Sequence, residues 1–481
     1  MRQTPWKLCG MQRKYFSNCR AGIQSDINLL KEVFLIEAVE KAVEIARLVA
    51  QYGGKTYFVG GFVRDKLRGV ENKDIDIEVH GILSKNLESI LDSVGDRVEI
   101  GKSFGVYNLK GFSLDIAMPR SEKAIGQKHR DFCIDIDPFI GTEKAALRRD
   151  FTMNAIMQDV LTGEITDHFG GMRDIKDSVI RCVSEESFSE DPLRVLRAAQ
   201  FAARFGFSIE KATVELCRRV DLSTLSQERV MEELKKALLK SDTPSLFFKN
   251  LRILRQLTVW FPEVEKLIDI KQNPIYHAEG DVWEHTMMVL DAAAKFRDRV
   301  KNPLGFMLSA LVHDFGKIVC TKVENGKIHS RNHEVLGLPL VEKFLKRLTK
   351  EKELISYVLN MAKLHMKPNI MARDNSSVRA TNRMFDEARE PEDLICLAVC
   401  DGLGKISEIP YSSAEKFLLE RLMIYKEYMS RDYVTGKDLI CAGITPGEDF
   451  KDLLEYAHKL RLSGIEKEDA LRQVLSYKRK N

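Results

Sequence analysis

The sequence predicts an α+β fold in which a small mixed-sheet head comes first and an all-α remainder follows. Residues 56–76 have the pattern of a strand, a helix and a second strand in one compact unit. Short strand-like runs follow at 97–100, 106–109 and 112–118, with turns between them. From 212 to about 267 the apolar residues recur at helical spacing instead, which indicates that the sheet has ended.

Composition limits the class of protein. The chain has 481 residues, 44% hydrophobic and 30% charged, which is enough for three or four domains. The net charge is only +4, so any nucleic-acid surface must come from local clusters of basic residues. The nine cysteines are scattered, and only Cys396 and Cys400 are close, which indicates reduced thiols without a zinc site of familiar spacing. No apolar run approaches a membrane span, so we expect no membrane partner and a cytoplasmic location.

The first 25 residues form a basic tail that precedes the first acid, Asp26. This composition resembles an organelle transit peptide, which would make the location organellar. A disordered basic tail, or a start codon placed too far upstream, explains it equally well. From Asp26 to about residue 50 the apolar positions recur at helical spacing, which predicts a helix leading into the first strand.

A double glycine ends the first predicted strand. β-forming residues stop at Gly60 and Gly61, where the missing side chains allow backbone N–H groups to approach an anion closely. Arg64 follows within one helical turn and adds a fixed positive charge. An isolated pair of glycines is usually a turn, but here the pair lies in one strand-helix-strand unit with the acids described next. The segment therefore predicts a phosphate site.

Paired carboxylates begin the second predicted strand. Asp74 and Asp76 are separated by one residue, so in an extended segment both side chains project from the same face. Hard oxygen ligands beside a phosphate site suit Mg²⁺. The run 112–118 alternates so that Asp115 can lie on the same open face, as a base for an attacking hydroxyl or as another metal ligand. A single Asp on a strand is also commonly just solvated.

These motifs resemble the nucleotidyltransferase signature of class II tRNA CCA-adding enzymes and bacterial poly(A) polymerases. The resemblance implies a polymerase-β-like nucleotidyltransferase head, in which the GGFVRD segment holds a nucleoside triphosphate and the DID segment holds two metal ions. The segment 148–155, RRDFTMNA, is close to a further family element and implies that Arg149 contacts the nucleotide. The polar segment 119–147 shows little regular pattern and occupies the place of a flexible loop that helps the family's active site switch from CTP to ATP.

A basic helix is predicted after the head, beginning at the cap-and-proline sequence 189–192. An arc of about 120° on this helix carries four polar side chains, and small apolar residues lie opposite. They are Arg194, Arg197, Gln200 and Arg204. Asp191 precedes Arg194 by three, so an acceptor and a donor fork can pair with base edges. EDPLR matches the family's amino-acid template for the incoming C or A; Gln200 departs from the arginine common in relatives, which leaves one contact in doubt.

A second metal constellation appears past 273–274. His285, the pair His313-Asp314 and Asp401 lie at helix ends or on predicted helices, where imidazole and carboxylate can converge on one divalent ion. The order resembles the HD phosphohydrolase superfamily and implies that these four residues bind a divalent metal of unknown identity. His333 and His365 could complete the site as phosphate or second-metal contacts. Some bacterial CCA-adding enzymes carry such a domain, which implies a phosphatase or 2′,3′-cyclic phosphodiesterase.

Five segments result from these patterns, and the last, a helical tail with a basic end, is expected to contact tRNA phosphates. They are a basic tail (1–25), the head (26–180), a helical RNA-binding neck (181–270), the HD domain (271–405) and the helical tail (406–481). The predicted activity is template-independent addition of CCA to tRNA from CTP and ATP. The alternatives are a poly(A) polymerase, a partial CC- or A-adding enzyme, a hydrolase whose head only binds ligand, and a non-catalytic tRNA-binding protein.

Overall fold

The computed structural model describes residues 35–478 except 73, 102–104, 125–131, 275–276 and 407–413. The chain divides into two compact units. The first contains residues up to 194 together with 207–216, and the second contains 195–206 and 217–481. The predictions made for the basic tail 1–25 lie outside the described residues, as does the start of the helix predicted from Asp26. That helix is present over residues 35–51.

The first unit is built on one mixed sheet of seven strands. Its order is β3-β4-β5-β2-β1-β8-β9, and only the pair β2–β5 is parallel. The strands are β1 (Lys55–Phe58), β2 (Ile75–His80), β3 (Arg97–Gly101), β4 (Val106–Leu109), β5 (Leu114–Ala117), β8 (Met157–Asp159) and β9 (Ile165–Thr166). The small mixed sheet predicted for the head is therefore confirmed.

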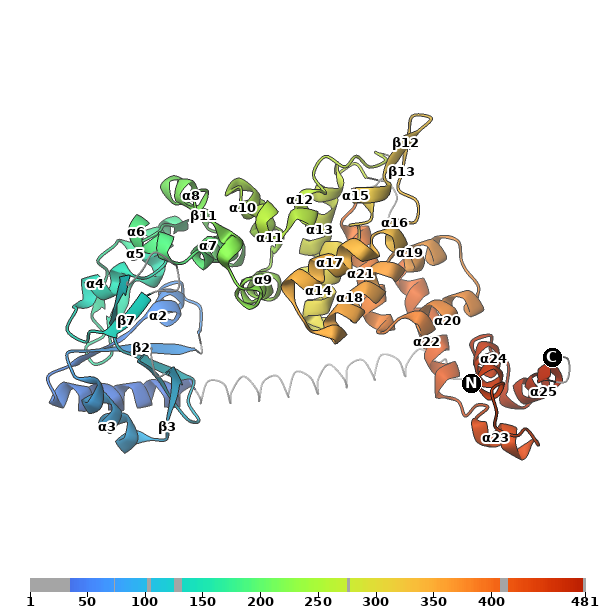
Figure 1. The fold of residues 1–481 in the computed structure, drawn as a ribbon, viewed down its shortest axis with the longest axis horizontal. Coiled ribbons are helices and arrows are strands. Elements are labelled where there is room, and N and C mark those ends of the chain that lie inside the picture. The colour runs from blue at the N-terminus through green and yellow to red at the C-terminus, as the bar shows by residue number, and fades with distance from the viewer. Residues whose placement is uncertain are drawn as a thin grey trace, which may run out of the picture. The chain divides into compact units, whose positions relative to one another are not determined.

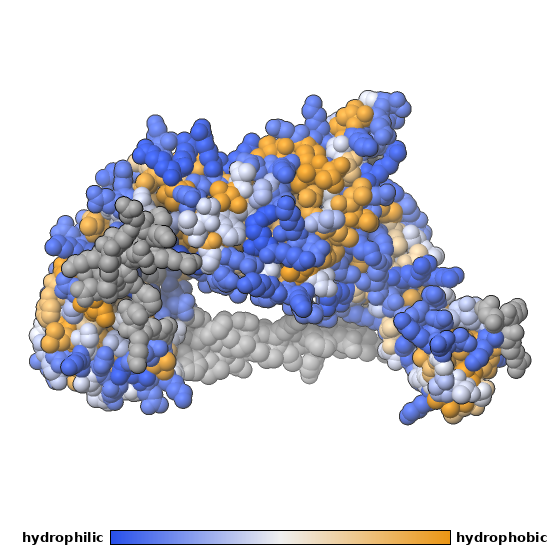
Figure 2. Space-filling model, in the orientation of Figure 1, coloured by the Kyte–Doolittle hydropathy of each residue, from blue (hydrophilic) through white to orange (hydrophobic). Residues whose placement is uncertain are grey.

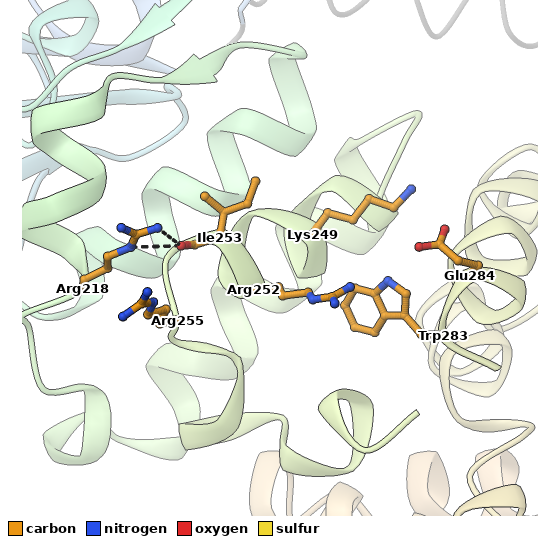
Figure 3. Close-up of a pocket in the computed structure, with 7 residues that line it drawn as sticks. All are labelled: Arg218, Lys249, Arg252, Ile253, Arg255, Trp283 and Glu284. Carbon is orange, nitrogen blue, oxygen red and sulfur yellow. Dashed lines mark hydrogen bonds between the residues drawn. The ribbon is translucent and has the colours of Figure 1, made fainter. Parts of the chain in front are cut away.

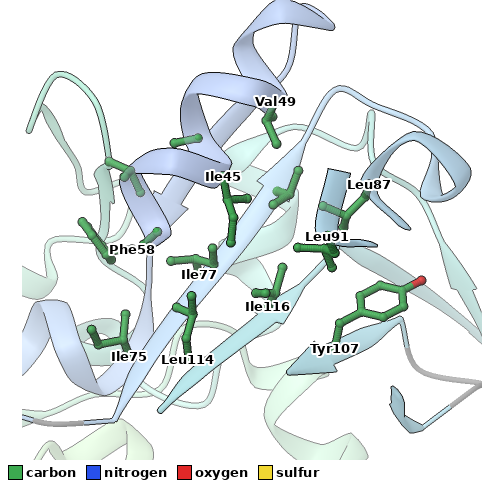
Figure 4. Close-up of a cluster of buried hydrophobic side chains, with 14 of the residues drawn as sticks. Ile45, Val49, Phe58, Ile75, Ile77, Leu87, Leu91, Tyr107, Leu114 and Ile116 are labelled. Atoms are coloured by element: carbon green, nitrogen blue, oxygen red, sulfur yellow. The ribbon is translucent and has the colours of Figure 1, made fainter. Parts of the chain in front are cut away.

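One face of this sheet is covered by the helix 35–51 and by α3 (Ser84–Val94) (Figure 4). Because strand side chains alternate, Ile75, Ile77 and Val79 of β2 enter this core, while Asp76 and Glu78 point to the opposite face. Each buried branched side chain contributes about 1.5–3 kcal/mol of transfer free energy. The apolar set that fixes the sheet thus also fixes which acids remain on the other face.

The segment 119–147 is more regular than the sequence suggested. It forms an antiparallel hairpin of β6 (Arg120–Ala124) and β7 (Phe132–Ile136), followed by α4 (Thr142–Leu147). The basic residues 128–130 lie outside the described residues. The expectation of a segment without regular structure is thus wrong for its described part, because the hairpin is created by cross-strand pairing, from Ala124 with Phe132 out to Arg120 with Ile136, rather than by local pattern.

Short elements connect the sheet to the helical part. They are α2 (Gly60–Leu67), η1 (Thr152–Asn154), α5 (Gly171–Asp177), β10 (Val179–Ile180), α6 (Glu185–Glu190), α7 (Leu193–Phe205), β11 (Ser208–Ile209) and α8 (Lys211–Cys217). Helix α7 begins two residues after Asp191, as the cap-and-proline signal predicts, and Asp191 Oδ1 accepts a hydrogen bond from the Leu193 N–H at 3.1 Å. Ser189, however, belongs to the preceding α6.

The described part of the second unit is almost entirely helical (Figure 1). Its neck consists of η2 (Leu222–Thr224), α9 (Gln227–Lys240), α10 (Ser245–Ile253), α11 (Leu257–Trp260) and α12 (Pro262–Glu265). Helix α9 begins after Ser226, whose side chain accepts a hydrogen bond from the Arg229 N–H and so caps the first turn.

The next helices form the core of the metal-binding region, and a small hairpin, β12 (Lys322–Glu324) with β13 (Lys327–His329), projects from it (Figure 1). They are α13 (Val282–Ala294), η3 (Arg297–Arg299), α14 (Pro303–Val312), α15 (Lys317–Cys320), α16 (His333–Leu336), α17 (Leu338–Leu348), α18 (Lys352–Leu364), α19 (Met366–Arg373), α20 (Val378–Glu387) and α21 (Pro391–Leu403). The tail is α22 (Ala414–Ser430), α23 (Gly436–Cys441), α24 (Phe450–Leu462) and α25 (Lys467–Lys478), and α23–α25 share a core of their own.

One stretch, Pro303–Cys320, is long and apolar enough to pass a test for a membrane span. That window is 72% buried inside the fold, as expected for the central helix of a helical domain. The expectation that no apolar stretch reaches this length is therefore wrong here, because His313 and Asp314 interrupt the run in the sequence while its average hydropathy stays high. Figure 2 shows hydrophilic and hydrophobic residues interspersed over the helices of this unit on the face in view.

Candidate nucleotide and metal sites

Three carboxylates meet on the open face of the head sheet. Asp76 of β2 and Asp115 of β5 are direct partners in the parallel register. Asp74 lies just before β2, where its Oδ1 accepts a hydrogen bond from Ser113 Oγ at 3.4 Å. Asp74 and Asp115 are exposed and Asp76 is half-buried. The predicted grouping of these three acids is therefore confirmed, while their roles remain predictions.

The double glycine lies directly beside these acids. Gly60 has φ +66°, a left-handed conformation that favours glycine, and a Cβ there would lie 3.4 Å from Asp76 Oδ2 and 3.9 Å from Arg149 Nη1. Helix α2 begins at Gly60, and no side chain caps its first turn. Its backbone N–H groups and positive dipole end are therefore available to an anion next to the carboxylates.

Repulsion and burial perturb the central acid. Burial raises the pKa of Asp76 to about 6, and the negative charges of Asp115 and Asp74 add to this effect, while Arg149 and Arg64 oppose it. A bound divalent cation would compensate all three carboxylates at once. This donor set of hard oxygens fits such a cation.

Arg149 is held at this site by a buried acid. Its Nη2 donates to Glu78 Oε2 at 2.8 Å, and Glu78 Oε1 lies 2.9 Å from His80 Nε2. Burial alone would raise the pKa of Glu78, but Arg149 and His80 lower it below its ordinary value, so Glu78 stays charged. Sequence reasoning missed Glu78, although it continues the every-second-residue pattern of Asp74 and Asp76.

Arg64 is buried and held by side chains of the first unit. Its guanidinium is buried and donates to both oxygens of Asp65, at 2.9 and 2.7 Å, and to Asn154 Oδ1 at 2.7 Å. Asn154 in turn donates to Asp150 Oδ1 at 2.9 Å. Arg64 therefore joins the glycine helix α2 to the 148–155 segment, and a Cβ at Gly61 would lie 3.5 Å from Arg64 Nη2. Its contact with a nucleotide phosphate stays a prediction.

The pair Asp191 and Arg194 begins helix α7 in the first unit. Arg194 Nη1 donates to the backbone oxygen and the hydroxyl of Ser187, at 2.5 and 2.8 Å, and Nη2 donates to the Arg148 carbonyl at 2.6 Å. Arg194 is thus held in place one residue from Arg149. Base reading by the pair stays a prediction, because Arg194 must share donors that already bind the backbone.

Arg197 and Gln200 follow on α7 and belong to the second unit. Arg197 is half-buried, lies over the Phe201 ring and has its Nη1 3.8 Å from Glu233 Oε1. Gln200 is 1% exposed, and its Nε2 has no hydrogen-bond partner. The predicted polar stripe is therefore wrong at Gln200, which faces inward. Its contact with a nucleotide stays in doubt.

In the second unit the four predicted HD residues meet in a buried cluster. His285 Nε2 lies 3.1 Å from Asp401 Oδ1, 3.6 Å from Asp314 Oδ2 and 3.3 Å from His313 Nε2. Lys317 Nζ is 2.8 Å from Asp314 Oδ2, yet that buried oxygen accepts no hydrogen bond of good geometry. Two imidazoles and two carboxylates with an unsatisfied oxygen fit a divalent metal ion.

A second histidine pair lies on the other oxygen of Asp314. His333 Nε2 is 3.1 Å from Asp314 Oδ1, and His365 Nε2 is 3.8 Å from the same atom. Both histidines orient their Nδ1 toward backbone carbonyls, which leaves Nε2 directed inward. Burial and the neighbouring His313 lower the pKa of His365 to about 3, so it is a neutral imidazole suited to a metal. Asp314 therefore separates two clusters of ligand atoms.

Charged side chains outside the ligand cluster complete the site. Glu279 Oε1 lies 3.1 Å from His285 Nδ1, and Lys405 Nζ lies 2.7 Å from Asp401 Oδ2. A cavity of about 460 Å³ opens here, lined by ligands, by Lys317 and Lys405, and by Arg331 next to the β12–β13 hairpin. Sequence reasoning missed Glu279, Lys317 and Lys405. Charged residues are common near any ligand in the sequence, so nothing distinguishes these three from ordinary surface residues.

The two sites define a class of protein: a chain that joins a nucleotidyltransferase head to a metal-dependent HD domain. Three family models match in this order. They are the "Poly A polymerase head domain" at 56–181, the "Probable RNA and SrmB- binding site of polymerase A" at 206–268 and the "HD domain" at 282–404. Both catalytic domain types imply dependence on divalent metal ions.

The chain belongs to the family of multifunctional CCA proteins. It is 34% identical over 414 residues to the Multifunctional CCA protein of Pseudoalteromonas atlantica, covering 82% of this chain and 95% of that one. It is 31% identical over 425 residues to that of Actinobacillus pleuropneumoniae, covering 85% and 98%.

Solved structures share the fold at lower identity. A Thermotoga maritima CCA-adding enzyme complexed with tRNA has a TM-score of 0.61 at 22% identity, covering 93% of this chain and 98% of that one. A Bacillus stearothermophilus CCA-adding enzyme in complex with CTP has a TM-score of 0.64 at 21% identity, covering 92% and 98%. These likenesses support the α+β head and helical body.

Proposed function

We propose that this protein adds CCA to the 3′ ends of tRNA from CTP and ATP without a nucleic-acid template, releasing pyrophosphate. The observation that supports this most directly is the grouping of Asp74, Asp76 and Asp115 beside the Gly60 bend and Arg149. Asp74 and Asp76 hold the divalent cations, which we take to be Mg²⁺. When bound, these cations stabilise the negative oxygens of the transferring phosphoryl group.

The chain's own groups supply the remaining steps. The N-terminus of α2 and Arg149 bind the triphosphate, and Asp115 accepts the proton of the tRNA 3′ hydroxyl as it attacks the α-phosphorus, or adds a metal ligand. A new P–O bond forms to the hydroxyl oxygen as the bond to pyrophosphate breaks. Asp191 and Arg194 distinguish C and A from other bases by their hydrogen-bonding edges, and Arg197 contributes to the same surface.

One incubation separates this activity from its rivals. The protein is mixed with a tRNA transcript lacking CCA and with all four labelled nucleoside triphosphates. Elongation that stops after C, C and A supports complete CCA addition. A long A tract indicates a poly(A) polymerase, a stop after CC or addition of A only to a CC end indicates a partial enzyme, and phosphate release without incorporation indicates a hydrolase.

The metal assignment has its own test. Asp74→Ala with Asp76→Ala should abolish incorporation while tRNA binding survives, because neither acid is placed against RNA. Glu99→Ala is a control on β3, the edge strand of the same sheet. Retained incorporation in the double variant would refute the assignment of these acids.

We further propose that the HD domain is a metal-dependent phosphohydrolase acting on phosphate monoesters or 2′,3′-cyclic phosphates of RNA ends. The supporting observation is the complete ligand set around Asp314, together with a cavity bordered by Lys317, Lys405 and Arg331, whose charges suit a phosphate. His285, His313 and Asp401 hold one metal with Asp314. His333 and His365, on its other oxygen, hold a second.

Metal content and hydrolysis together test this proposal. We expect about two metal ions bound by the HD domain and release of phosphate or ring opening with cytidine 2′,3′-cyclic phosphate. His365→Ala should lower metal content by about one ion, and His313→Ala with Asp314→Ala should remove hydrolysis while CCA addition continues. A metal content unchanged by His365→Ala would contradict the second metal.

A further inference from the structure

Two cavities of the second unit have walls of different chemistry. The first, of about 540 Å³, lies where the neck meets α13 (Figure 3). Its cations all belong to the segment 206–268, which matches an RNA-binding model, and they are Arg218, Lys249, Arg252 and Arg255. Such fixed charges hold a phosphate but accept no proton at neutral pH. The second cavity is the one at the HD metal ligands, and its wall contains His277, an imidazole that can accept one.

His277 lies beside the metal ligands without being placed among them. Its ring meets the His285 ring edge to face, with the ring centroids 5.1 Å apart. It lines the same cavity of about 460 Å³ as the ligands Asp314 and Asp401. A cavity of this size admits a ligand as large as a nucleotide. A phosphate ester that enters the cavity therefore meets His277 next to the metal ligands.

Glu279 determines which nitrogen of His277 is available. Glu279 Oε1 lies 2.8 Å from His277 Nδ1 and 3.1 Å from His285 Nδ1, and Oε2 accepts from the Ile406 N–H at 2.9 Å. The Glu279 side chain is 1% exposed, and a buried acid surrounded by donors in this way is a charged carboxylate. It accepts from Nδ1–H, so the neutral His277 ring carries its lone pair on Nε2. Among the described residues this Nε2 has no hydrogen-bond partner.

Backbone hydrogen bonds hold His277 in this position. The His277 N–H donates to the Asn273 carbonyl at 3.0 Å, and the Ala278 N–H donates to the Ile406 carbonyl at 3.2 Å. Ile406 comes shortly after α21, the helix that carries Asp401. The segment that contains His277 is therefore fixed to the end of a helix that supplies a metal ligand.

A role for Glu279 in orienting His285 explains only part of this arrangement. A carboxylate on the Nδ1 of a metal-binding histidine orients that ligand, which accounts for the contact between Glu279 and His285. It does not account for a second imidazole on the same carboxylate oxygen, at a cavity wall and with its Nε2 unpaired. His329 lines the same cavity, but among the described residues no carboxylate pairs with it. A carboxylate and an imidazole paired in this way at a hydrolytic site can move a proton.

We propose that His277 is a catalytic residue of HD hydrolysis, which carries a proton from the attacking water to the leaving ribose oxygen. The inference rests on the proposed phosphohydrolase function and adds the residue that moves the proton. His277 and Glu279 both precede the segment 282–404 that matches the HD model.

The proton makes two transfers in this step. The Nε2 of His277 takes a proton from water as the water oxygen bonds to phosphorus, and the Glu279 carboxylate stabilises the imidazolium that results. The bond from phosphorus to the ribose oxygen then breaks, its electron pair stays on that oxygen, and Nε2 gives the proton to it. A 2′,3′-cyclic phosphate thereby becomes a phosphate monoester with one free hydroxyl.

Leaving groups of different basicity test the inference. Cytidine 2′,3′-cyclic phosphate releases a ribose hydroxyl, which must be protonated. Bis(4-nitrophenyl) phosphate and 4-nitrophenyl phosphate release a nitrophenolate, which is stable as an anion, and the better substrate of the two is used. His277→Ala should lower kcat/KM for the cyclic phosphate by about a hundredfold or more, and for the nitrophenyl ester by about tenfold at most. The metal content of His277→Ala should equal that of the unsubstituted protein.

His329→Ala is the matched control, because it removes another imidazole from the same cavity wall. We expect it to leave the ratio of the two activities unchanged. Equal effects on both substrates in His277→Ala, or the same change of ratio in His329→Ala, would overturn the inference. Loss of metal from His277→Ala would also overturn it, because the facing atoms of His277, Glu279 and His285 would then hold an ion themselves.

The same measurements separate this inference from the proposed function. If the unsubstituted protein hydrolyses neither kind of ester, the proposed phosphohydrolase function fails and the inference fails with it. If the unsubstituted protein hydrolyses both and His277→Ala leaves their ratio unchanged, only the inference is rejected.

Discussion

Glu78 determines where Arg149 points, although it is not placed against the nucleotide itself. The bond from Arg149 Nη2 to Glu78 Oε2 is 2.8 Å long and charge-assisted, so replacing the carboxylate by an amide removes a contribution of about 1.5–3 kcal/mol. With Glu78→Gln we expect the KM for CTP and ATP to rise about tenfold, which corresponds to about 1.4 kcal/mol. Steady-state kinetics at saturating tRNA measures this. Glu143→Gln, an exposed acid in the same unit, is the control; an unchanged KM in Glu78→Gln would contradict the positioning role.

The raised pKa of Asp76 predicts how metal binding in the head depends on pH. In the metal-free protein this pKa is about 6, and a cation needs the deprotonated carboxylate. Metal affinity should therefore fall about tenfold for each pH unit below 6 and level off above about 7. Because the pKa of Asp76 is higher in the folded protein than in the unfolded chain, the bound proton stabilises the folded metal-free protein at low pH. This stabilisation is lost as the pH rises through 6.

Calorimetric titration with Mg²⁺ from pH 5 to 8 measures this dependence. His313→Ala with Asp314→Ala serves as the background, so that the HD domain takes up no metal. Asp76→Asn in this background should remove the dependence of Mg²⁺ affinity on pH. Affinity that stays constant between pH 5 and 7 would show that Asp76 does not compete with protons at the site.

At the level of single residues, the sequence predicts the acids more reliably than the arginines. Asp74, Asp76 and Asp115 could be placed because strand alternation alone puts them on one face. The side chain of Arg64 could not, because its donors are taken up by Asp65 and by Asn154, ninety residues away. The inward position of Gln200 could not be predicted either. Helical periodicity gives the direction of the Gln200 side chain around the helix axis but not which elements pack against it.

Among the elements, Gly316 connects the metal ligands of the HD domain. A Cβ at Gly316 would lie 1.9 Å from the His333 carbonyl oxygen, a backbone atom that cannot move away alone. Gly316→Ala should therefore separate α15 from α16 and displace His333 from Asp314. We expect loss of HD metal and a destabilisation of about 1–3 kcal/mol, as for overpacking in general.

Metal analysis and thermal unfolding measure the effect of Gly316→Ala. Gly447→Ala is the control, because a Cβ there would lie 3.9 Å from the Thr445 carbonyl oxygen, an ordinary contact. CCA addition should continue in both variants, since the head ligands lie in the first unit. Normal HD metal content in Gly316→Ala would show that α15 and α16 can separate while His333 stays beside Asp314.

Local pattern predicts those elements whose signal lies within a few residues. The start of α7 follows from Asp191 and Pro192, and the strand β2 follows from its alternation. The hairpin β6–β7 was missed because four of the five residues of Arg120–Ala124 are polar, and their extended conformation depends on partners in Phe132–Ile136. Helix α6 is only six residues long, which is too short for a clear helical period.

At the scale of the whole molecule, the order of motifs predicts the order of domains. The head acids precede the basic helix, and the HD residues come last, which is the order in which the three family models match. The sequence does not reveal how a neck helix is fixed to the HD domain, because the residues that join them are distant in the chain. Within the second unit, Glu263 of α12 and Arg347 of α17 make such a link.

This link predicts a pH-dependent attachment of the neck to the HD domain. Arg347 Nη1 and Nη2 donate to the two oxygens of Glu263 at 2.8 and 2.7 Å, and Glu263 is buried. Burial alone would raise the pKa of Glu263, but Arg347 lowers it below its ordinary value. The stabilisation is therefore complete above the unfolded pKa of about 4.3 and is lost as pH falls through the lowered folded value.

Arg347→Met removes one partner and leaves a buried carboxylate, which costs about 3 kcal/mol in comparable pairs. At pH 7 we expect faster hydrogen exchange of backbone amides in α12 and α17 and a lower unfolding temperature. Glu263→Gln with Arg347→Met should recover part of the loss, because the uncompensated charge is gone. The difference between Arg347→Met and the unsubstituted protein should shrink as the pH is lowered below 4. A difference that is constant from pH 7 to pH 3 would mean that packing of the Arg347 side chain, rather than its charge, joins the two helices.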